Sequence, residues 1–375
     1  MTDHLTPLER ARNRRSFGIV DDFDGDRLAL ARRRQRMQRT ELARLVGVTA
    51  TAITQFERNR SRPTVPLANA MALTLGVPAE FLRHGLEIAP VAASAAHFRS
   101  LRSTPALSRE QALAFAEISL AVVAAFEQYV QFPPVRLPTL QVEGEMVSDQ
   151  IKEIARETRL HLGLAPGPVN HVIRTLEAAG AVVLTLPIGP RVDARVDAFS
   201  TDAGPRPLIL LSPEKNDRAR SRFDAAHELG HLVMHPDVEP GSKLVEEQAQ
   251  TFASQFLAPD DELLPDLPRV LDWEALLAAK QKWRISLAAL AYRARRLGVW
   301  SDSTYLRAAK RLATDGYPER GSLGPRELPS TLGKAVELLA GVSFGVDDLA
   351  REFRLPIEMV QQVVESGSSA RLSLI

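Results

Sequence analysis

The chain of 375 residues contains no cysteine, and this absence excludes disulfide bonds and thiolate-bound metal. Any metal ion must then be held by histidine, aspartate or glutamate. The sequence also lacks an uninterrupted apolar run of about 18 residues, and the segment 1–18 lacks the apolar core of a secretory signal. We therefore expect a cytoplasmic protein with no membrane contact.

Acidic and basic residues nearly cancel, leaving a net charge of +1, but the charge is unevenly distributed. Residues 27–62 contain ten arginines against Glu41 and Glu57, a local excess of +8. Concentrated positive charge favours binding to a polyanion such as nucleic acid, and the alternative is an ordinary solvated helix face. The overall composition, 45% hydrophobic and 25% charged, is typical of a folded globular protein.

The length predicts two or three domains of about 100 to 200 residues each. Composition divides the chain into five expected parts. These are a flexible N-terminal tail at 1–24, a helical domain at 25–84, a helical connector with a proline-rich linker at 85–147, a mixed domain at 148–315, and a loop with a helical segment at 316–375. The last part has a helix-turn-helix cadence at 346–360, but its acidic residues favour packing or partner contact over DNA binding.

The connector contains an apolar stretch at 108–130 that predicts one long, mostly buried helix. The same stretch offers a surface for dimerisation. Prolines between 133 and 138 are expected to end this helix and to form a stiff linker. Beyond the linker, expected helices alternate with short strands at 181–186, 194–200 and 207–211, which indicates an α+β domain.

Within the N-terminal domain, a short helix, a turn and a second helix are predicted between residues 40 and 58. The first helix ends at Gly47, a natural helix stop, and Thr49 is a suitable N-cap for the second. This order is that of a helix-turn-helix, whose second helix enters the major groove of DNA with small or polar side chains outward. The expected small core consists of Leu42, Leu45, Val48, Ile53 and Phe56.

Polar side chains left outside that core are the candidates for contact with DNA. They are Arg39, Thr49, Thr51, Thr54, Gln55 and Arg58. Together with the turn Arg58-Asn-Arg-Ser-Arg-Pro63, the segment resembles the Xre/Cro-type helix-turn-helix family over about 55 residues. The resemblance implies binding to double-stranded DNA, with Arg33, Arg34, Arg39 and Arg60 contacting phosphates. A protein-interaction module is the alternative.

The second motif is His227-Glu228-Leu-Gly-His231. This spacing places two imidazoles one turn apart on the same helix face, where both can reach one zinc ion. Glu228 beside them is suited to take a proton from water and pass it to a leaving amine. Composition alone would produce roughly 0.01 copies of this pattern, so coincidence is a poor explanation.

A catalytic zinc ion normally has three protein ligands and one open position, so a third ligand is expected. The candidates in this chain are His235, Glu246 and Glu247. His235 lies two turns beyond His227, about 12 Å along a straight helix, which is too far for all three histidines to converge. We therefore expect His235 to be a helix-end residue.

The segments 222–235 and 246–259 resemble the zinc helix and the second motif of the ImmA/IrrE metallopeptidases. The resemblance implies that Glu246 is the third zinc ligand, with Glu247 as the fallback. The chain also resembles fused helix-turn-helix/ImmA/IrrE regulators over about 25–320, with high specificity at the zinc helix and weaker specificity elsewhere. The implied fold is multidomain: an all-α helix-turn-helix domain, an α+β zincin-like metallopeptidase domain and a helical C-terminal segment.

The resemblance also implies a function: a DNA-binding transcriptional regulator whose zinc metallo-endopeptidase cleaves a protein, such as a repressor or itself, in a stress or mobile-element response. The alternative is a non-catalytic transcription factor or antitoxin-like regulator whose metallopeptidase fold is a sensor. Glu228 favours the enzyme, because a binding domain needs no general base. Candidate oxyanion stabilisers are Tyr292, Arg222 and His161. We expect a homodimer, because single helix-turn-helix units usually bind paired half-sites.

Overall fold

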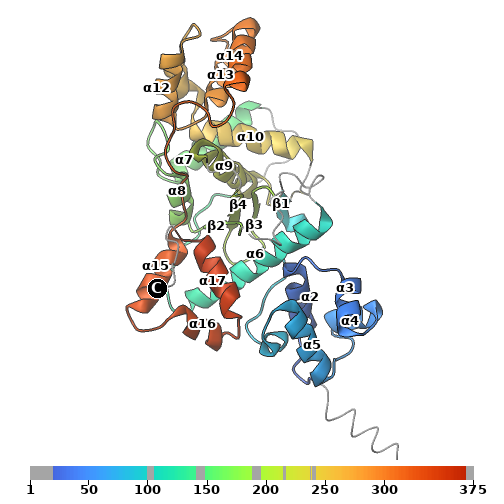
Figure 1. Cartoon of the computed structure of the whole chain (residues 1–375). Coiled ribbons are helices and arrows are strands. Elements are labelled where there is room, and N and C mark those ends of the chain that lie inside the picture. The colour runs from blue at the N-terminus through green and yellow to red at the C-terminus, as the bar shows by residue number, and fades with distance from the viewer. Residues whose placement is uncertain are drawn as a thin grey trace, which may run out of the picture.

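The protein is described from a computed structural model over residues 20–98, 105–140, 148–187, 196–213, 217–236, 238 and 242–368. Its elements, drawn in Figure 1, are α2 (Gly25–Arg34), α3 (Arg39–Val46), α4 (Ala50–Glu57), α5 (Val65–Leu75), η1 (Ala79–Leu82), η2 (Ala93–Ala95), β1 (Ala96–Phe98), α6 (Ala106–Glu127), α7 (Ser148–His161), α8 (Val172–Ala178), β2 (Val182–Thr185), β3 (Phe199–Thr201), β4 (Leu208–Leu211), α9 (Arg218–Met234), α10 (Lys243–Leu257), α11 (Asp260–Leu263), η3 (Leu264–Asp266), α12 (Trp273–Trp283), α13 (Leu287–Arg296), α14 (Asp302–Asp315), α15 (Thr331–Ala340), α16 (Val346–Glu352) and α17 (Ile357–Ser366).

Helices α2 to α5 form the expected helical bundle at the N-terminal end. Gly47 adopts a left-handed conformation, with φ of 74°, that ends α3, and the Thr49 side chain caps α4 by accepting a hydrogen bond from the Ala52 N–H. Leu42 and Ile53 are fully buried between the helices. The expected core is wrong at Leu45, whose side chain is 46% exposed, because it lies on the outer side of α3.

Part of the expected N-terminal tail is packed. Val20 and Phe23 are buried, and Phe23 pairs with Arg83 in an isolated β-bridge. The Asp24 side chain then caps α2 by accepting hydrogen bonds from two backbone N–H groups. The bundle therefore begins by residue 20, and residues 1–19 of the predicted tail lie outside the described part of the chain.

A four-stranded sheet in the order β1-β3-β4-β2 forms the centre of the molecule. Strands β2 and β4 are parallel, whereas β3 pairs antiparallel with both β4 and β1. Alternate residues of each buried strand face opposite cores: Val182 and Leu208 belong to one, and Val183 and Ile209 to the other. Both faces of β2 and β4 are covered, and these two strands are accordingly apolar over Val182–Leu184 and Leu208–Leu211.

Helix α6 lies between the N-terminal bundle and the sheet (Figure 1). Residues 112–123 of this helix are all buried by contacts within the chain. The expectation that this helix offers a dimerisation surface is therefore wrong, because α2, β4 and α17 already cover it. The expected connector also contains β1, and its proline segment is packed, since the Leu140 N–H donates to the Val233 carbonyl at 2.9 Å.

The C-terminal helices α15 to α17 return to the centre of the molecule, beside α6 and β2 (Figure 1). Gly367 makes this return possible, because a Cβ there would lie 2.6–2.7 Å from side-chain atoms of Leu332 and Leu184. The segment 346–360 thus packs against the rest of the chain. The fold class is the predicted one: an all-α helix-turn-helix domain, an α+β domain and a helical C-terminal segment. None of the described helices has the length and apolar character of a membrane span.

Candidate metal centre and DNA-binding surface

Two helices, α9 and α10, position the residues of the predicted metal site. Helix α9 begins at Arg218, about one turn before the expected start, because the Asp217 side chain caps it. Gly230 allows the two helices to approach closely, since a Cβ there would lie 2.9 Å from the ring of Phe252. The crossing places Glu246, in the first turn of α10, opposite the histidines of α9.

His227, His231 and Glu246 converge, with one ligand atom from each within 4.8 Å of the others. The two Nε2 atoms lie 3.1 Å apart, and the Glu246 carboxylate lies 3.3 Å from His227 Nε2 and 3.7 Å from His231 Nε2. A tetrahedral zinc ion with bonds of about 2.0 to 2.1 Å separates neighbouring ligand atoms by roughly 3.3 Å. The geometry and the donor types therefore fit such an ion.

A chain of hydrogen bonds continues from His231 into α10. The two Nδ1 atoms of His231 and His235 lie 3.2 Å apart, and His235 Nε2 lies 2.9 Å from Gln248 Oε1. If Nε2 of His231 is a ligand, its Nδ1–H donates to His235, and the Nε2–H of His235 donates to the Gln248 carbonyl oxygen. Burial lowers the pKa of His235, which favours the neutral ring that this chain requires.

Glu228 is fully buried and lies against the sheet. The Ser200 hydroxyl of β3 donates a hydrogen bond of 2.8 Å to Glu228 Oε2. Ser200 is itself fully buried, so this bond forms away from bulk water. It therefore connects the glutamate of the HExxH motif to the strand that runs beside α9.

The remaining candidates for the site are placed differently. His235 caps the end of α9, as expected, and the carboxylate of Glu247 pairs with Lys243 at 3.4 Å, outside the group of three. His161 Nε2 lies 2.9 Å from the carbonyl of Arg136, on an exposed surface. Tyr292 lines a pocket described below.

Arg222, a candidate oxyanion stabiliser, is fully buried in a different network. Its guanidinium forms an ion pair with Glu327 and donates to the Val169 carbonyl at 2.6 Å. Glu327, from the loop after α14, is buried as well and accepts a hydrogen bond from the Ile173 N–H. The network fastens α9 to α8 and to that loop, so Arg222 has a structural role.

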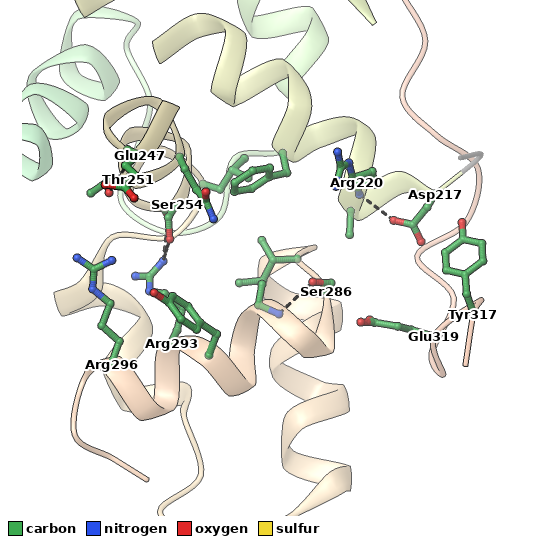
Figure 2. A pocket seen from close by; sticks show the side chains of 17 residues that line it. Asp217, Arg220, Glu247, Thr251, Ser254, Ser286, Arg293, Arg296, Tyr317 and Glu319 are labelled. Atoms are coloured by element: carbon green, nitrogen blue, oxygen red, sulfur yellow. Dashed lines mark hydrogen bonds between the residues drawn. The ribbon is translucent and has the colours of Figure 1, made fainter. Parts of the chain in front are cut away.

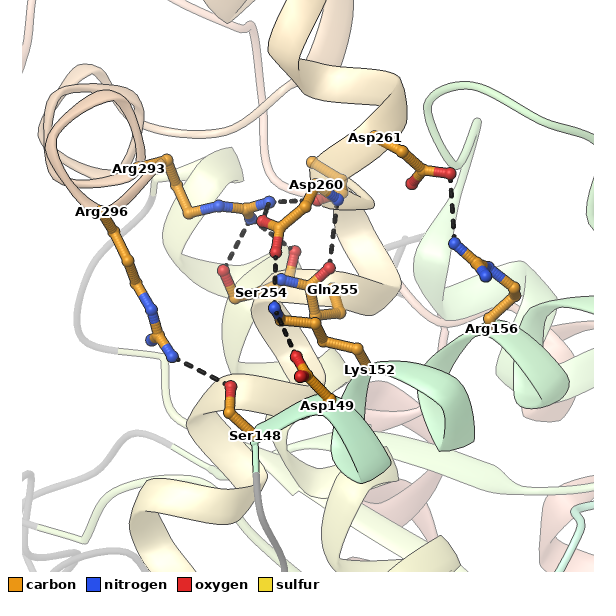
Figure 3. A network of polar contacts seen from close by, with 11 residues as sticks. Ser148, Asp149, Lys152, Arg156, Ser254, Gln255, Asp260, Asp261, Arg293 and Arg296 are labelled. Carbon is orange, nitrogen blue, oxygen red and sulfur yellow. Dashed lines mark hydrogen bonds and ion pairs between the residues drawn. The ribbon is translucent and has the colours of Figure 1, made fainter. Parts of the chain in front are cut away.

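A pocket of about 790 Å³ lies between the N-terminal half of α9, α10, α13 and the segment 317–319 (Figure 2). Its lining includes Phe223, whose ring centroid is 6.3 Å from that of His227, and Glu247, the residue after Glu246. Arg293 lines it from α13, where its guanidinium bonds Ser254 and Asp260 (Figure 3). The pocket therefore lies about one turn of α9 from His227, although none of the three ligand residues lines it.

The predicted DNA-contacting residues gather on α3 and α4. Arg39, Thr49, Thr51, Gln55 and Arg58 are exposed, and Thr54 is half-buried. Two of these side chains already form polar contacts within the protein. The Thr54 hydroxyl donates to the Ala50 carbonyl, and Arg39 pairs with Glu57, although its side chain stays 49% exposed.

Two of the expected phosphate contacts are wrong. Both oxygens of the Glu117 carboxylate accept hydrogen bonds from Arg33, at 2.9 and 2.6 Å. Arg34 is half-buried; desolvation lowers the pKa of its guanidinium, while the charge of Glu358 raises it. Both arginines therefore face the rest of the chain, because α2 packs against α6. Arg39 and Arg60 remain exposed.

Comparison with known proteins finds a family match for each of these two regions. A helix-turn-helix family model matches residues 28–82, which include α3 and α4. A peptidase family model described as the IrrE N-terminal-like domain matches residues 176–295, which include β2 to β4, α9 and α10. His227, His231 and Glu246 all lie inside the second match. No curated protein matches the chain.

Proposed function

Because this chain joins a helix-turn-helix domain to an IrrE-like domain of a metallopeptidase family, we propose that it is a DNA-binding regulator that hydrolyses a peptide bond. The observation that carries the proposal is the convergence of His227, His231 and Glu246, with Glu228 next to His227 in the chain. A zinc site with three protein ligands keeps one position open, as catalysis requires.

In the proposed reaction, His227, His231 and Glu246 hold the metal and Glu228 is the general base. Zinc held there would supply Lewis-acid chemistry. Glu228 accepts a proton from the attacking water and then donates it to the leaving amine, so the water adds across the broken C–N bond. Ser200 orients the Glu228 carboxylate by donating a hydrogen bond to Oε2.

The proposed substrate is a protein, such as a transcriptional repressor or a second copy of this chain, cleaved in a stress or mobile-element response. The pocket beside His227 supports a polymeric substrate, because about 790 Å³ can hold several side chains. Its charged lining includes Arg220, Arg296, Asp217 and Glu319. Such a lining suits a polar peptide segment.

The first experiment measures the zinc content of the purified protein and of two matched variants. We expect about one zinc per chain, lost in Glu246→Ala and retained in Glu247→Ala, whose side chain lies outside the group. Zinc that is absent, or retained in Glu246→Ala, would contradict the proposed ligand set. Intact-mass analysis of the zinc-loaded chain with candidate repressors then tests cleavage.

A second candidate function, that of a sensor without turnover, is favoured by the environment of Glu228. Its carboxylate is fully buried and bonded to Ser200, and such a group is not freely available to water. Glu228→Gln distinguishes the two, because it removes the base and retains the shape. If the variant keeps zinc and fold but loses its regulatory output, the peptidase is supported; an unchanged output supports the sensor.

For the helix-turn-helix domain, we propose that a homodimer binds paired half-sites in double-stranded DNA. Arg58 and Gln55 are exposed on α4, the helix expected to enter the major groove. Affinity should fall as salt rises, because bound phosphates release counterions. A salt-independent affinity, or a monomer on DNA by light scattering, would contradict one part of this proposal.

A further inference from the structure

Two of the neighbours of strand β3, namely α9 and β1, bear on the proposed active site. On one side it contacts α9, where Ser200 donates its hydrogen bond to Glu228. In the sheet it lies between β4 and β1, so its second edge is covered by the three residues Ala96–Phe98. The edge of the sheet beside the candidate base is thus closed by a short strand from elsewhere in the chain.

The covering strand matches β3 residue for residue. Ala96 lies opposite Thr201, residue 97 opposite Ser200, and residue 98 opposite Phe199, in an antiparallel register. A strand edge left open presents unpaired N–H and C=O groups, and an extended peptide can bind there by adding a strand. Strand β1 occupies these groups along the whole length of β3.

The covering strand comes from outside the peptidase-like region. The IrrE-like match covers 176–295, which includes β2, β3 and β4 but not β1. Without β1, those three strands would form a sheet with β2 at one edge, as now, and β3 at the other. The segment that closes it belongs to the connector after the helix-turn-helix domain.

The approach to β1 is fastened to the DNA-binding bundle through Glu117 of α6. One carboxylate oxygen of Glu117 accepts a hydrogen bond of 3.0 Å from the Val91 N–H, five residues before the strand. The same carboxylate pairs with Arg33 of α2. A single buried side chain therefore joins the recognition domain to the segment that leads into the covering strand.

We infer that residues 96–98 are a built-in occupant of the strand edge at which an extended protein segment docks for cleavage. The substrate pairs antiparallel with β3 and replaces β1, so the chain excludes substrate until this strand leaves. The effect on cleavage rests on the proposed peptidase function. The competition itself concerns peptide binding and is measured without turnover.

The test uses a fluorescein-labelled peptide of residues 91–98 as the probe and Glu228→Gln as the background, so that no cleavage occurs. His97→Pro opens the edge, because proline removes a backbone donor and disfavours the strand. The pair Ala96→Cys and Thr201→Cys closes it. Directly opposed antiparallel residues have Cα atoms about 4.5 to 5.5 Å apart, within the range for a disulfide, and the chain has no other cysteine.

We expect His97→Pro to bind the peptide at least ten-fold more tightly than the unopened protein, measured by fluorescence anisotropy. A form that carries all three substitutions should bind like His97→Pro when reduced and lose that gain when oxidised. The inference would be overturned if the proteins with and without His97→Pro bound the peptide equally. It would also be overturned if oxidation left the affinity of the triply substituted form unchanged. Each comparison holds whether or not the chain has peptidase activity, so failure here is separate from failure of the proposed function.

Hydrogen exchange of the unmodified protein provides an independent measurement if His97→Pro does not fold. The amides of 96–98 should exchange at least ten-fold faster than those of β4, because the covering strand opens without unfolding the sheet. Exchange as slow as that of β4 would make β1 an integral strand and would contradict the inference.

Discussion

Arg33 and Glu117 form a two-pronged ion pair between α2 and α6, with donor–acceptor distances of 2.9 and 2.6 Å. The carboxylate is 2% exposed and the Arg33 side chain 19%, so the acidic partner of the pair is buried. Arg33 was expected to contact DNA. It instead connects α2 of the DNA-binding bundle to α6, which lies beside the sheet. Among the described residues 27–62, the exposed arginines lie on α3, at the end of α4 and in the turn after α4: Arg39, Arg44, Arg58, Arg60 and Arg62.

Arg33→Ala should reduce the free energy of unfolding by about 3 kcal/mol, because it leaves Glu117 buried without its charge partner. Arg44→Ala is the matched control: Arg44 is exposed on α3, and its loss should cost less than about 0.5 kcal/mol. Urea unfolding measures both. If Glu117→Gln added to Arg33→Ala recovers no stability, the cost does not arise from a stranded charge.

Arg58→Ala should weaken DNA binding and reduce the slope of log K against log salt by about 1, because it removes one exposed positive charge from the surface expected to face DNA. Arg58 is exposed at the end of α4, whereas Arg33 is engaged within the chain. A fluorescence titration across salt concentrations measures the slope. A slope that changes more for Arg33→Ala than for Arg58→Ala would contradict the placement of the basic surface.

Gln248→Ala should weaken zinc binding by about 10- to 100-fold, because His235 loses the acceptor that orients it toward His231. Competition with a chelator gives the affinity. Gln250→Ala is the control, since Gln250 lies on the same helix but lines the pocket. Gln248→Glu, which keeps an oxygen at this position, should restore most of the affinity. If it binds zinc as weakly as Gln248→Ala, the hydrogen bond is not the cause.

The local patterns of this chain could be predicted from the sequence because they depend on residues three or four apart. His227 and His231 share a helix face through their spacing alone, and Gly47 and Thr49 mark the turn between α3 and α4. The assignment of Glu246 as the third zinc ligand depended on the resemblance to a family. Spacing along the chain gives no direct sign of which helix will cross α9.

The contacts around the site could not be predicted, because each joins segments that only the fold brings together. Ser200 bonds a residue 28 positions away, and Glu327 pairs with Arg222 at a separation of 105. The residues of both contacts are polar, and the sequence alone would place such residues on the surface. Strand β1 could not be predicted for a related reason: three residues are too few for a strand pattern.

Asp260, at the start of α11, contacts side chains of α7, α10 and α13 (Figure 3). Its carboxylate accepts a hydrogen bond of 2.6 Å from Arg293 and pairs with Lys152 at 3.3 Å. Burial raises the pKa of Asp260, but the hydrogen bond with Gln255 and the charges of Arg293 and Lys152 outweigh burial and hold it below its usual range.

A lowered pKa in the folded state means that ionised Asp260 stabilises the fold above the ordinary aspartate pKa of about 3.9, and that this contribution is lost as pH falls through the lower folded value. Asp260→Asn should therefore cost about 2 kcal/mol at pH 7, and the difference from the unmodified protein should shrink below about pH 4. Asp261→Asn is the control, because Asp261 is 64% exposed and pairs only at the surface with Arg156. Urea unfolding across pH gives both curves, and a difference that stays constant down to pH 2.5 would show that the charge of Asp260 is not what holds these helices together.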